Sequence, residues 1–424
     1  MPHALVLYHY MPPDEVVSAR QLGDLAEGLV ARGWRVTAMP SARRHKAGRA
    51  ALPGRERMRS VRYRRVYRPD WDQSRLAGRL ANTAWMLLAW VYAAINRRMA
   101  RDVDVVIVGT DPLFGVLAGW AWKLFRPRVK VVHWCFDLHP EAAVADGMAA
   151  ADAPGVRALK ALLKRAYRRC DLIVDIGPCM ADRLAAYEHG RARTTLTPWA
   201  LAEPDAPLPV DPAQRAEVFG DARLGLSYSG SFGQAHSHEL LLALARSLGE
   251  QPMRLAFSVG GHRADVLRAA VGDDDANVAF VPFAPLEKLP QRLGCADVHV
   301  MSLKDEWTGT VVPSKFFGAL AAGRPVVFAG SEDAAIARWI RQYRVGWVLT
   351  RETLPAVAND MARLCDRPGE LAAMRQRCWA VYRRRFSRRS MLDAWDAALR
   401  GVLAGRAVSR PAAACGRASN RQAA

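Results

Sequence analysis

Short apolar stretches alternate with helical patterns along most of the chain. In the first half, the stretches that we interpret as strands are rich in Val and Ile and almost free of charge, and segments of helical periodicity separate most of them. Strands that are apolar on both faces are typical of a parallel sheet covered by helices on both sides. The predicted strands are Leu5–Tyr8, Arg35–Met39, Asp104–Gly109, Lys130–Phe136 and Asp171–Gly177, with a helix at Ser18–Ala31.

The same pattern restarts after a segment rich in proline. Residues Ala202–Pro212 contain four prolines and few large apolar side chains, which is typical of a linker rather than of core structure. We therefore predict an α/β protein with two doubly wound units, residues 1–203 and 213–374, followed by helices over 375–404 and a disordered tail at 405–424. Six further strands are predicted within 224–230, 254–261, 277–283, 296–303, 324–330 and 345–350.

Composition narrows the class and the compartment. Of the 424 residues, 51% are hydrophobic and 24% charged, which excludes wholesale disorder. The seven cysteines are scattered without a CxxC pair, which favours a reducing compartment and argues against a disulfide framework or a zinc site. The N-terminus lacks the pattern of a signal peptide, and the longest uncharged apolar stretch, Ala84–Ile95, is shorter than the roughly 20 residues that span a bilayer. We expect a cytoplasmic protein.

The positive charge is concentrated at the two ends of the chain. The net charge is +20, and residues 1–200 carry 32 basic and 18 acidic side chains, whereas 201–374 carry 17 and 21. Residues 375–424 add 12 basic and 2 acidic side chains, and the densest basic run is Arg43–Arg68. Such a charge predicts an anionic partner that contacts the first unit and the last helices.

Open parallel sheets bind ligands beyond the carboxyl ends of their strands, so the loops that follow the strands are the candidate sites. Residues 229–236, Ser-Gly-Ser-Phe-Gly-Gln-Ala-His, place glycines where backbone amides can approach a phosphate, and His236 could donate to a phosphate or a sugar hydroxyl. The alternative is an ordinary turn with Ser237 as a helix cap. In residues 307–315, Ser314 can cap a helix whose first turn, with Lys315, would meet an anion.

The first unit offers a different kind of candidate. Asp137, His139 and Glu141 follow a buried strand, where two carboxylates and an imidazole could position an acceptor hydroxyl. The alternative is that Asp137 or Glu141 caps the next helix. The stretch Trp85–Ile95, with arginines around it, fits either a membrane interface or a core helix, and its nearly uniform apolarity favours the core helix.

Five segments, taken in order, resemble glycosyltransferase family 4, and in particular its bacterial enzymes of colanic-acid, O-antigen and capsule assembly. They are YMPPDEVVSARQLGDLAEGLVARGWRVTAM, DLHPE, YSGSFGQAH, FVPFAPLEKLPQRLGCADVHVMSL and VVPSKFFGALAAGRPVVF. The resemblance spans about Leu5–Leu349. It implies a GT-B fold, in which two Rossmann-like domains face each other across a cleft and the last helix crosses back to the N-terminal domain.

The resemblance also implies roles for particular residues. The C-terminal unit would bind a nucleotide sugar, with UDP or GDP as the nucleotide, and the loop Met11–Arg20 would close over it. The implied donor-binding residues are Gly230, Ser231, Phe232, Gly260, Gly261, Pro282, Phe283, Thr310, Ser314 and Lys315. Asp137, His139 and Glu141 would hold the acceptor, and His236 would lie at the diphosphate and sugar.

The family likeness further implies the reaction. It implies sugar transfer with retention of anomeric configuration, without a metal or another cofactor, to a lipid-diphosphate-linked saccharide in exopolysaccharide, capsule or lipopolysaccharide O-antigen synthesis. With the charge, it implies an enzyme of the cell envelope that associates peripherally with the anionic inner face of the plasma membrane. Many members carry two glutamates at positions that are Thr310 and Gly318 here, so Lys315 is expected to meet the phosphate charge.

Three other functions are compatible with parts of the pattern. A nucleotide-sugar epimerase of related architecture would need no basic membrane face. An inactive scaffold in a polysaccharide assembly complex would account for the missing glutamates. A nucleic-acid-binding protein could use Arg43–Arg68, where Tyr63 and Tyr67 are interleaved, but no known nucleic-acid module is present, and we expect no nucleic-acid partner.

Overall fold

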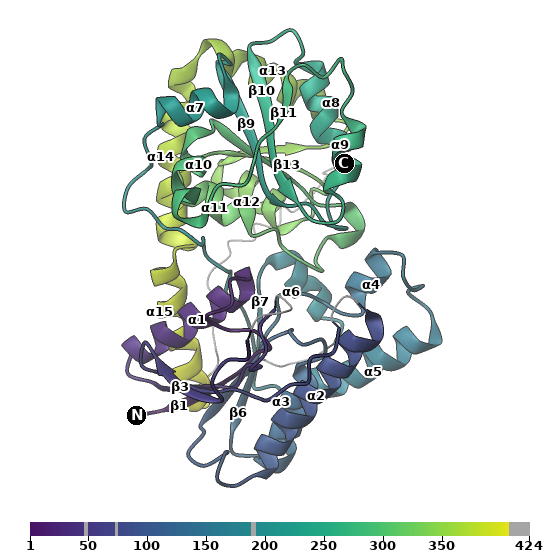
Figure 1. Ribbon diagram of the computed structural model, residues 1–424, viewed down its shortest axis with the longest axis vertical. Helices are drawn as coiled ribbons and strands as arrows, with labels where there is room; N and C mark the ends of the chain where they lie inside the picture. Colours follow the sequence, from purple (N-terminus) through teal and green to yellow (C-terminus); the bar gives the residue numbers. More distant parts are fainter. Residues whose placement is uncertain (46–49, 73–74, 188–191, 407–424) are drawn as a thin grey trace, which may run out of the picture.

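Two separate β-sheets organise the chain into two domains (Figure 1). The computed structural model describes residues 1–45, 50–72, 75–187 and 192–406. The first sheet has eight strands and the second has six, and helices pack on both. These are the two doubly wound units that the alternation of apolar strands and helices predicts.

The N-terminal sheet has the order β3-β4-β2-β1-β5-β6-β7-β8. All neighbouring strands are parallel except β3, which runs antiparallel to β4. Every residue of β1, β5 and β7 is buried, because helices cover both faces of the sheet. The strands are β1 His3–Leu7, β2 Arg35–Ala38, β3 Arg55–Met58, β4 Val61–Arg64, β5 Val105–Val108, β6 Lys130–Trp134, β7 Leu172–Asp175 and β8 Ala192–Thr195.

The hairpin β3–β4 was not predicted, because it lies inside the basic run. Val61 and Tyr63 are buried and Arg62 between them is exposed, so the strand has one apolar face. The turn is made by Arg59 and Ser60, both with positive φ (46° and 68°). Asn or Gly usually fills such turns, so the sequence lacks the usual hairpin signal.

Helices cover the N-terminal sheet in two groups. α3 packs against both α2 and α5, and these three form one layer, while α1 packs against the last helix of the chain (Figure 1). The helices of this domain are α1 Val17–Ala31, α2 Leu76–Ile95, α3 Val116–Phe125, α4 Glu141–Ala145, α5 Pro154–Tyr167 and α6 Pro178–Leu184.

The C-terminal sheet is parallel with the order β11-β10-β9-β12-β13-β14. Its strands are β9 Leu224–Ser231, β10 Met253–Gly260, β11 Val278–Phe280, β12 Val298–Ser302, β13 Val326–Ala329 and β14 Gly346–Leu349. The helices of this domain are α7 Pro212–Phe219, α8 Glu239–Ser247, α9 Ala264–Ala270, α10 Leu289–Cys295, α11 Lys315–Ala321, α12 Ala335–Tyr343 and α13 Leu354–Asp366, with 3₁₀ turns η1 Leu286–Lys288 and η2 Asp305–Trp307.

The last two helices connect the domains. α14 (Pro368–Arg385) packs on α11 and α13, and α15 (Arg388–Leu403) then packs on α1 of the N-terminal domain (Figure 1). There Arg32 pairs with Asp393 at 2.6 Å, and the Trp34 indole N–H donates to Asp396 at 2.6 Å. The chain thus returns to the first domain as the resemblance implied. The predicted tail lies, from residue 407, outside the described residues.

The two domains also touch directly across the cleft. The Leu138 N–H donates to the Thr310 carbonyl at 3.0 Å, and Arg338 of α12 pairs with Asp182 of α6 at 2.9 Å. The proline-rich linker is anchored, because the buried guanidinium of Arg324 donates to the Leu208 carbonyl at 2.9 Å and to the Gly294 carbonyl. The carboxyl edges of both sheets are therefore held facing each other.

Candidate active site

A cavity of about 320 Å³ opens at the switch point of the C-terminal sheet. β9 lies between β10 and β12 in this sheet, and this reversal of strand order is where open α/β sheets bind ligands. One wall belongs to the C-terminal domain, and the facing wall comes from the start of α1 and the segment that joins the domains. The lining residues include Gly230, Ser231, Phe283, Ser314 and Lys315 on the first wall, and Val17, Trp199 and Leu201 on the second.

Lys315 carries the only formal charge among the described residues that line this cavity. Its Nζ donates to the Ser231 carbonyl at 3.0 Å and lies 5.2 Å from the centre of the Tyr228 ring. Burial lowers the pKa of the ammonium to about 8, with no described carboxylate close enough to raise it. A partly desolvated ammonium without a carboxylate partner is arranged to meet an anion from solution.

Gly230 allows Lys315 to reach this position. Its φ is 127°, and a Cβ at this position would lie 2.8 Å from Cε of Lys315. A side chain here would therefore strain the backbone and displace the lysine. Gly230 therefore leaves room for the Lys315 side chain. Its lack of a side chain would also let the backbone of the predicted phosphate loop approach a ligand closely.

His236 lies beside Lys315 but in a different role from the predicted one. Its Nδ1 is 2.7 Å from the Ser302 carbonyl, which can only accept, so Nδ1 carries the proton. Burial and, second, the charge of Lys315 lower the pKa of His236 to about 4, so the ring is neutral at pH 7. Its Nε2 lone pair then faces Nζ of Lys315 at 3.5 Å. His236 was expected to donate a hydrogen bond to a phosphate. In the structure its Nε2 is instead an acceptor that orients the Lys315 ammonium.

An aromatic ring stands exposed at the edge of the cavity. Phe283 is 52% exposed, and its ring lies so close to Gly260 that a Cβ there would be 2.7 Å from the ring. The Ser258 hydroxyl of β10 donates to the carbonyl of Pro282, the residue before Phe283, at 3.0 Å. Gly261 (φ 102°) directly follows β10. An exposed ring fixed on a strand end suits stacking against a flat ligand ring.

Phe232 and Thr310, two of the predicted donor-binding residues, are buried away from the cavity, and Gly260, Gly261 and Pro282 are not among the residues that line it. Phe232 is fully buried in the C-terminal domain against Tyr228, so the expectation that it binds the donor is wrong for its side chain. Thr310 is also fully buried, because its hydroxyl donates to the Trp307 carbonyl at 2.7 Å within a tight turn. Its carbonyl meets Leu138 instead and links the domains.

Ser314 faces the cavity without capping the helix. It lines the cavity and is exposed, but its φ and ψ are helical (−66° and −17°) and its side chain makes no cap hydrogen bond. Ser314 therefore takes the predicted N-cap position of α11, but its side chain does not form the expected cap hydrogen bond. The hydroxyl stays available to a ligand beside Lys315.

The facing edge of the N-terminal sheet presents a small polar cluster. Asp137 follows β6 and opens to the cleft, and desolvation, followed by the charge of Asp111, raises its pKa to about 6. Asp111 follows β5, and its carboxylate lies 3.1 Å from Nδ1 of His9, which follows β1. Sequence analysis missed His9 and Asp111, although each lies just beyond a predicted strand. Only their positions after predicted strands could have identified them, because neither residue lies in a recognisable motif.

Glu141 turns away from this cluster. It is 8% exposed, accepts a hydrogen bond from the Tyr187 hydroxyl and lies 3.4 Å from Nζ of Lys160. The carboxylate therefore holds α4 against its neighbours, and the expectation that it holds the acceptor is wrong for this arrangement. His139 is half-buried, and burial lowers its pKa. Neither Asp137 nor Glu141 caps α4, which has no side-chain cap.

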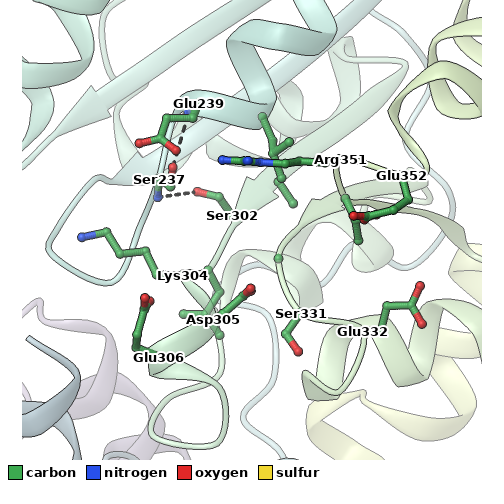
Figure 2. Close-up of a pocket in the computed structure, with 15 residues that line it drawn as sticks. Ser237, Glu239, Ser302, Lys304, Asp305, Glu306, Ser331, Glu332, Arg351 and Glu352 are labelled. Atoms are coloured by element: carbon green, nitrogen blue, oxygen red, sulfur yellow. Dashed lines mark hydrogen bonds between the residues drawn. The ribbon is translucent and has the colours of Figure 1, made fainter.

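A larger hollow of about 710 Å³ lies beyond β12, β13 and β14 (Figure 2). Five carboxylates and two cations line it: Glu239, Asp305, Glu306, Glu332 and Glu352, with Lys304 and Arg351. Ser237 does not cap α8 as predicted, since His238 takes that position, although the Ser237 hydroxyl accepts from the Glu239 N–H at 3.3 Å. The excess of carboxylates repels a diphosphate, so the smaller cavity is the better anion site.

Two properties bear on the wider predictions. Throughout the residues that the structure describes, no three His, Cys, Asp or Glu side chains are grouped so that they could hold a metal ion. In the same part of the chain, no helix has both the length and the apolarity to cross a membrane.

Comparison with solved structures identifies the architecture. Sucrose-phosphate synthase (tll1590) from Thermosynechococcus elongatus superposes with a TM-score of 0.68 at 16% identity, over 96% of this chain and 100% of that one. Anabaena Alr3699/HepE, solved in complex with UDP, gives 0.65 at 11% identity, over 95% of this chain and 100% of that one. At these identities the likeness establishes the fold, which is GT-B.

The sequence itself matches a family. Residues 18–199 match the family described as Glycosyltransferase Family 4. A Pseudomonas aeruginosa protein described as probable glycosyltransferase WbjE is 25% identical over 309 residues, which are 70% of this chain and 74% of that protein. The family match lies within the N-terminal domain, whereas the match to the Pseudomonas protein is longer than that domain. The chain is therefore a glycosyltransferase with a GT-B fold, and its N-terminal domain is similar to glycosyltransferase family 4.

Proposed function

We propose that this glycosyltransferase moves a sugar from a UDP- or GDP-sugar to a saccharide carried on a lipid diphosphate. The observation that carries the proposal is the single ammonium of Lys315 at the switch-point cavity. A diphosphate is the charged part of the donor, and it leaves with an additional negative charge as the sugar departs. An ammonium held in place before the reaction stabilises that developing charge.

The donor fits the cavity in size and chemistry. A volume of about 320 Å³ lies within the usual range for small-molecule sites. The nucleotide base would stack on Phe283, and the diphosphate would meet Lys315, the Ser314 hydroxyl and the backbone at Gly230 and Ser231. His236 keeps the lysine directed toward the phosphates, since its Nε2 faces Nζ.

The acceptor would enter from the N-terminal domain. Asp137 opens to the cleft from β6, with Asp111 and His9 beside it. In its ionised form, Asp137 can accept a hydrogen bond from the acceptor hydroxyl and so orient it toward the sugar. We infer that Asp137 positions the acceptor, while His139 contributes from the same loop.

The stereochemistry and the cofactor requirement follow from the same arrangement. We expect retention of configuration, because family 4 enzymes typically retain and Asp137 is needed only to orient the acceptor. We also expect no metal requirement, because Lys315 supplies the positive charge that a divalent ion would otherwise give the diphosphate.

We place the enzyme at the inner face of a bacterial plasma membrane, in exopolysaccharide, capsule or O-antigen synthesis. A lipid diphosphate and the surrounding lipid headgroups are anionic, and the chain carries a net charge of +20. Each basic residue near such a surface contributes about 1 kcal/mol to binding. The basic charge lies mainly in the domain that would hold the acceptor.

The test is transfer of labelled sugar from UDP- and GDP-sugars into an organic-extractable lipid fraction, with native bacterial membranes as the source of acceptor. We expect label in the lipid with one nucleotide class, retained in EDTA and lost in Lys315→Ala. Lys304→Ala, which removes a lysine outside the cavity, is the matched control and should transfer normally. Transfer from neither nucleotide class, with nucleotide binding intact, would refute the lipid-linked acceptor.

A further inference from the structure

A continuous apolar surface lies on the outside of the N-terminal domain. Helix α2 buries one side, including Met86 and Trp90, and exposes another. The exposed side carries Trp85, Leu88, Tyr92 and Ile95, whose spacing of three, four and three residues places them on one face of the helix. Leu124 and Phe125 at the end of α3 are exposed as well. We call these six residues the α2 face.

The two helices form one surface because they are joined at their ends. The Arg126 guanidinium, just past α3, donates to the carbonyls of Ala94 and Ile95 at the end of α2, both at 3.0 Å. Leu88 is 67% exposed and Tyr92 60%, so this is a row of large apolar side chains, most of which are about half or more exposed to solvent. Contiguous exposed apolar surface of this kind marks a docking site on a protein or a membrane.

Positive charge predominates around the α2 face, although Asp72 pairs with Arg75 at 3.5 Å at the start of α2. No acidic residue occurs between Asp72 and Asp102, or between Asp111 and Asp137. Exposed arginines border the face at both ends, with Arg75 and Arg79 at the start of α2 and Arg97, Arg98 and Arg128 beyond its end. Trp, Tyr and Leu on one helical face with flanking arginines are suited to the headgroup boundary of a bilayer.

The cleft end of this surface is aromatic. The Trp85 indole N–H donates to the Tyr67 carbonyl at 2.6 Å, and the Trp85 ring lies edge-on to Trp71 at 5.8 Å. Tyr67 and Trp71 are themselves exposed. α2 begins on the side of the sheet where the strands end, because the chain leaves the carboxyl end of β4, passes through α2 and returns to the start of the parallel strand β5. The face therefore runs from the acceptor side of the domain outward.

We propose that the α2 face docks the enzyme onto an anionic lipid bilayer, with the side chains of Trp85, Leu88, Tyr92 and Ile95 at the headgroup boundary and the bordering arginines on lipid phosphates. This deepens the proposed function, and it rests on that function for the lipid-linked acceptor. The bilayer is the occupant that the charge favours, because a second copy of this chain would bring the same arginines against each other.

The test is cosedimentation of the full chain with phosphatidylcholine vesicles, with and without phosphatidylglycerol, at low and high salt. Leu88→Ser/Tyr92→Ser removes apolar contact, and Arg97→Gln/Arg98→Gln removes two charges. The matched controls are Val266→Ser, at an exposed residue of α9, and Arg363→Gln/Arg367→Gln, an exposed arginine pair at the end of α13 in the C-terminal domain. Nucleotide binding of each variant verifies that it is folded.

The expected result is binding to vesicles that contain phosphatidylglycerol, weakened by salt, by about tenfold or more in each of the two α2-face variants, and unchanged in both controls. Three results would overturn the proposal: equal loss in the arginine control, unchanged binding in both α2-face variants, or a wild-type dimer in light scattering that Leu88→Ser/Tyr92→Ser dissociates. Since the assay needs no donor or acceptor, it can fail while sugar transfer succeeds, and the reverse.

Discussion

Replacement of Lys315 by methionine should stabilise the unliganded protein while it weakens nucleotide binding. Methionine keeps the length and most of the apolar area of the lysine stem but removes the ammonium. The ammonium is partly desolvated, and no described carboxylate compensates it. The site is therefore prepared for its ligand at a cost in stability, which is common at functional sites.

The size of the effect follows from the pKa of Lys315. Burial lowers it from 10.5 to about 8. At about 1.4 kcal/mol for each tenfold change in proton affinity, the full penalty at pH 7 has an upper bound of roughly 3 kcal/mol. Lys315 keeps some contact with solvent, and the variant loses the hydrogen bond to the Ser231 carbonyl, so we expect a net gain of about 1 kcal/mol.

The sign of the pH dependence is also fixed. The folded state releases the Lys315 proton near pH 8, whereas the unfolded chain holds it to about pH 10.5, so between these values the unfolded state binds more protons. The stability of the wild type therefore rises with pH through this window relative to the variant. The desolvation penalty is largest at or below pH 7 and falls by roughly 40% at pH 9, and the advantage of Lys315→Met falls with it.

The assay is urea unfolding followed by tryptophan fluorescence at pH 7 and pH 9, on the wild type, Lys315→Met and Lys304→Met. The lysine control should show no gain in stability and no pH-dependent difference from the wild type. If Lys315→Met is less stable than the wild type at pH 7, or if its advantage grows with pH, the Lys315 ammonium is not the uncompensated charge that the reasoning requires.

Three further predictions concern other parts of the molecule. Phe283→Ala should weaken nucleotide binding by about tenfold in calorimetry, because stacking on an aromatic ring contributes about 1–3 kcal/mol; Val266→Ala should not. Asp137→Asn should lower kcat without changing nucleotide affinity, and the wild-type kcat should fall as pH drops through about 6, where the Asp137 carboxylate takes up a proton; an unchanged acid limb in the variant would contradict this role. Arg324→Met should destabilise the C-terminal domain by about 3 kcal/mol in urea unfolding, because it leaves buried carbonyls at Gly294, Ala296 and Leu208 without donors; Arg254→Met is the control.

Much of the fold could be predicted from local pattern. The strands of both sheets that the sequence analysis identified are continuous apolar runs with turn residues around them, and such runs are unambiguous when both faces of a strand are buried. β3 and β4 were missed because their arginines alternate with few apolar residues and their turn contains no glycine or asparagine. β8 was missed because its sequence, ARTT, has almost no apolar content.

Site residues could be predicted where the residue type itself indicates a use at that position. They could not be predicted where the role depends on the direction in which the side chain points. Lys315 and Gly230 were found because a lysine at a helix start and a glycine after a strand have specific uses. Phe232 and Glu141 were misassigned because a position shortly after a strand, directly after β9 for Phe232 and at the start of α4 for Glu141, fixes the edge of the sheet but not whether the side chain faces the cleft or the core. His9 needed the fold, since it comes within 3.1 Å of Asp111 only through strand pairing.

The most direct test of the central claim is the affinity of UDP and GDP for the wild type, Lys315→Ala and Lys304→Ala, measured by titration calorimetry at pH 7 and pH 9. The account predicts that one nucleotide binds the wild type at pH 7, that its affinity falls by about ten- to a hundredfold in Lys315→Ala, and that raising the pH weakens binding only where Lys315 is present. Equal affinity in Lys315→Ala, or an equal loss in Lys304→Ala, would contradict a donor diphosphate held by Lys315.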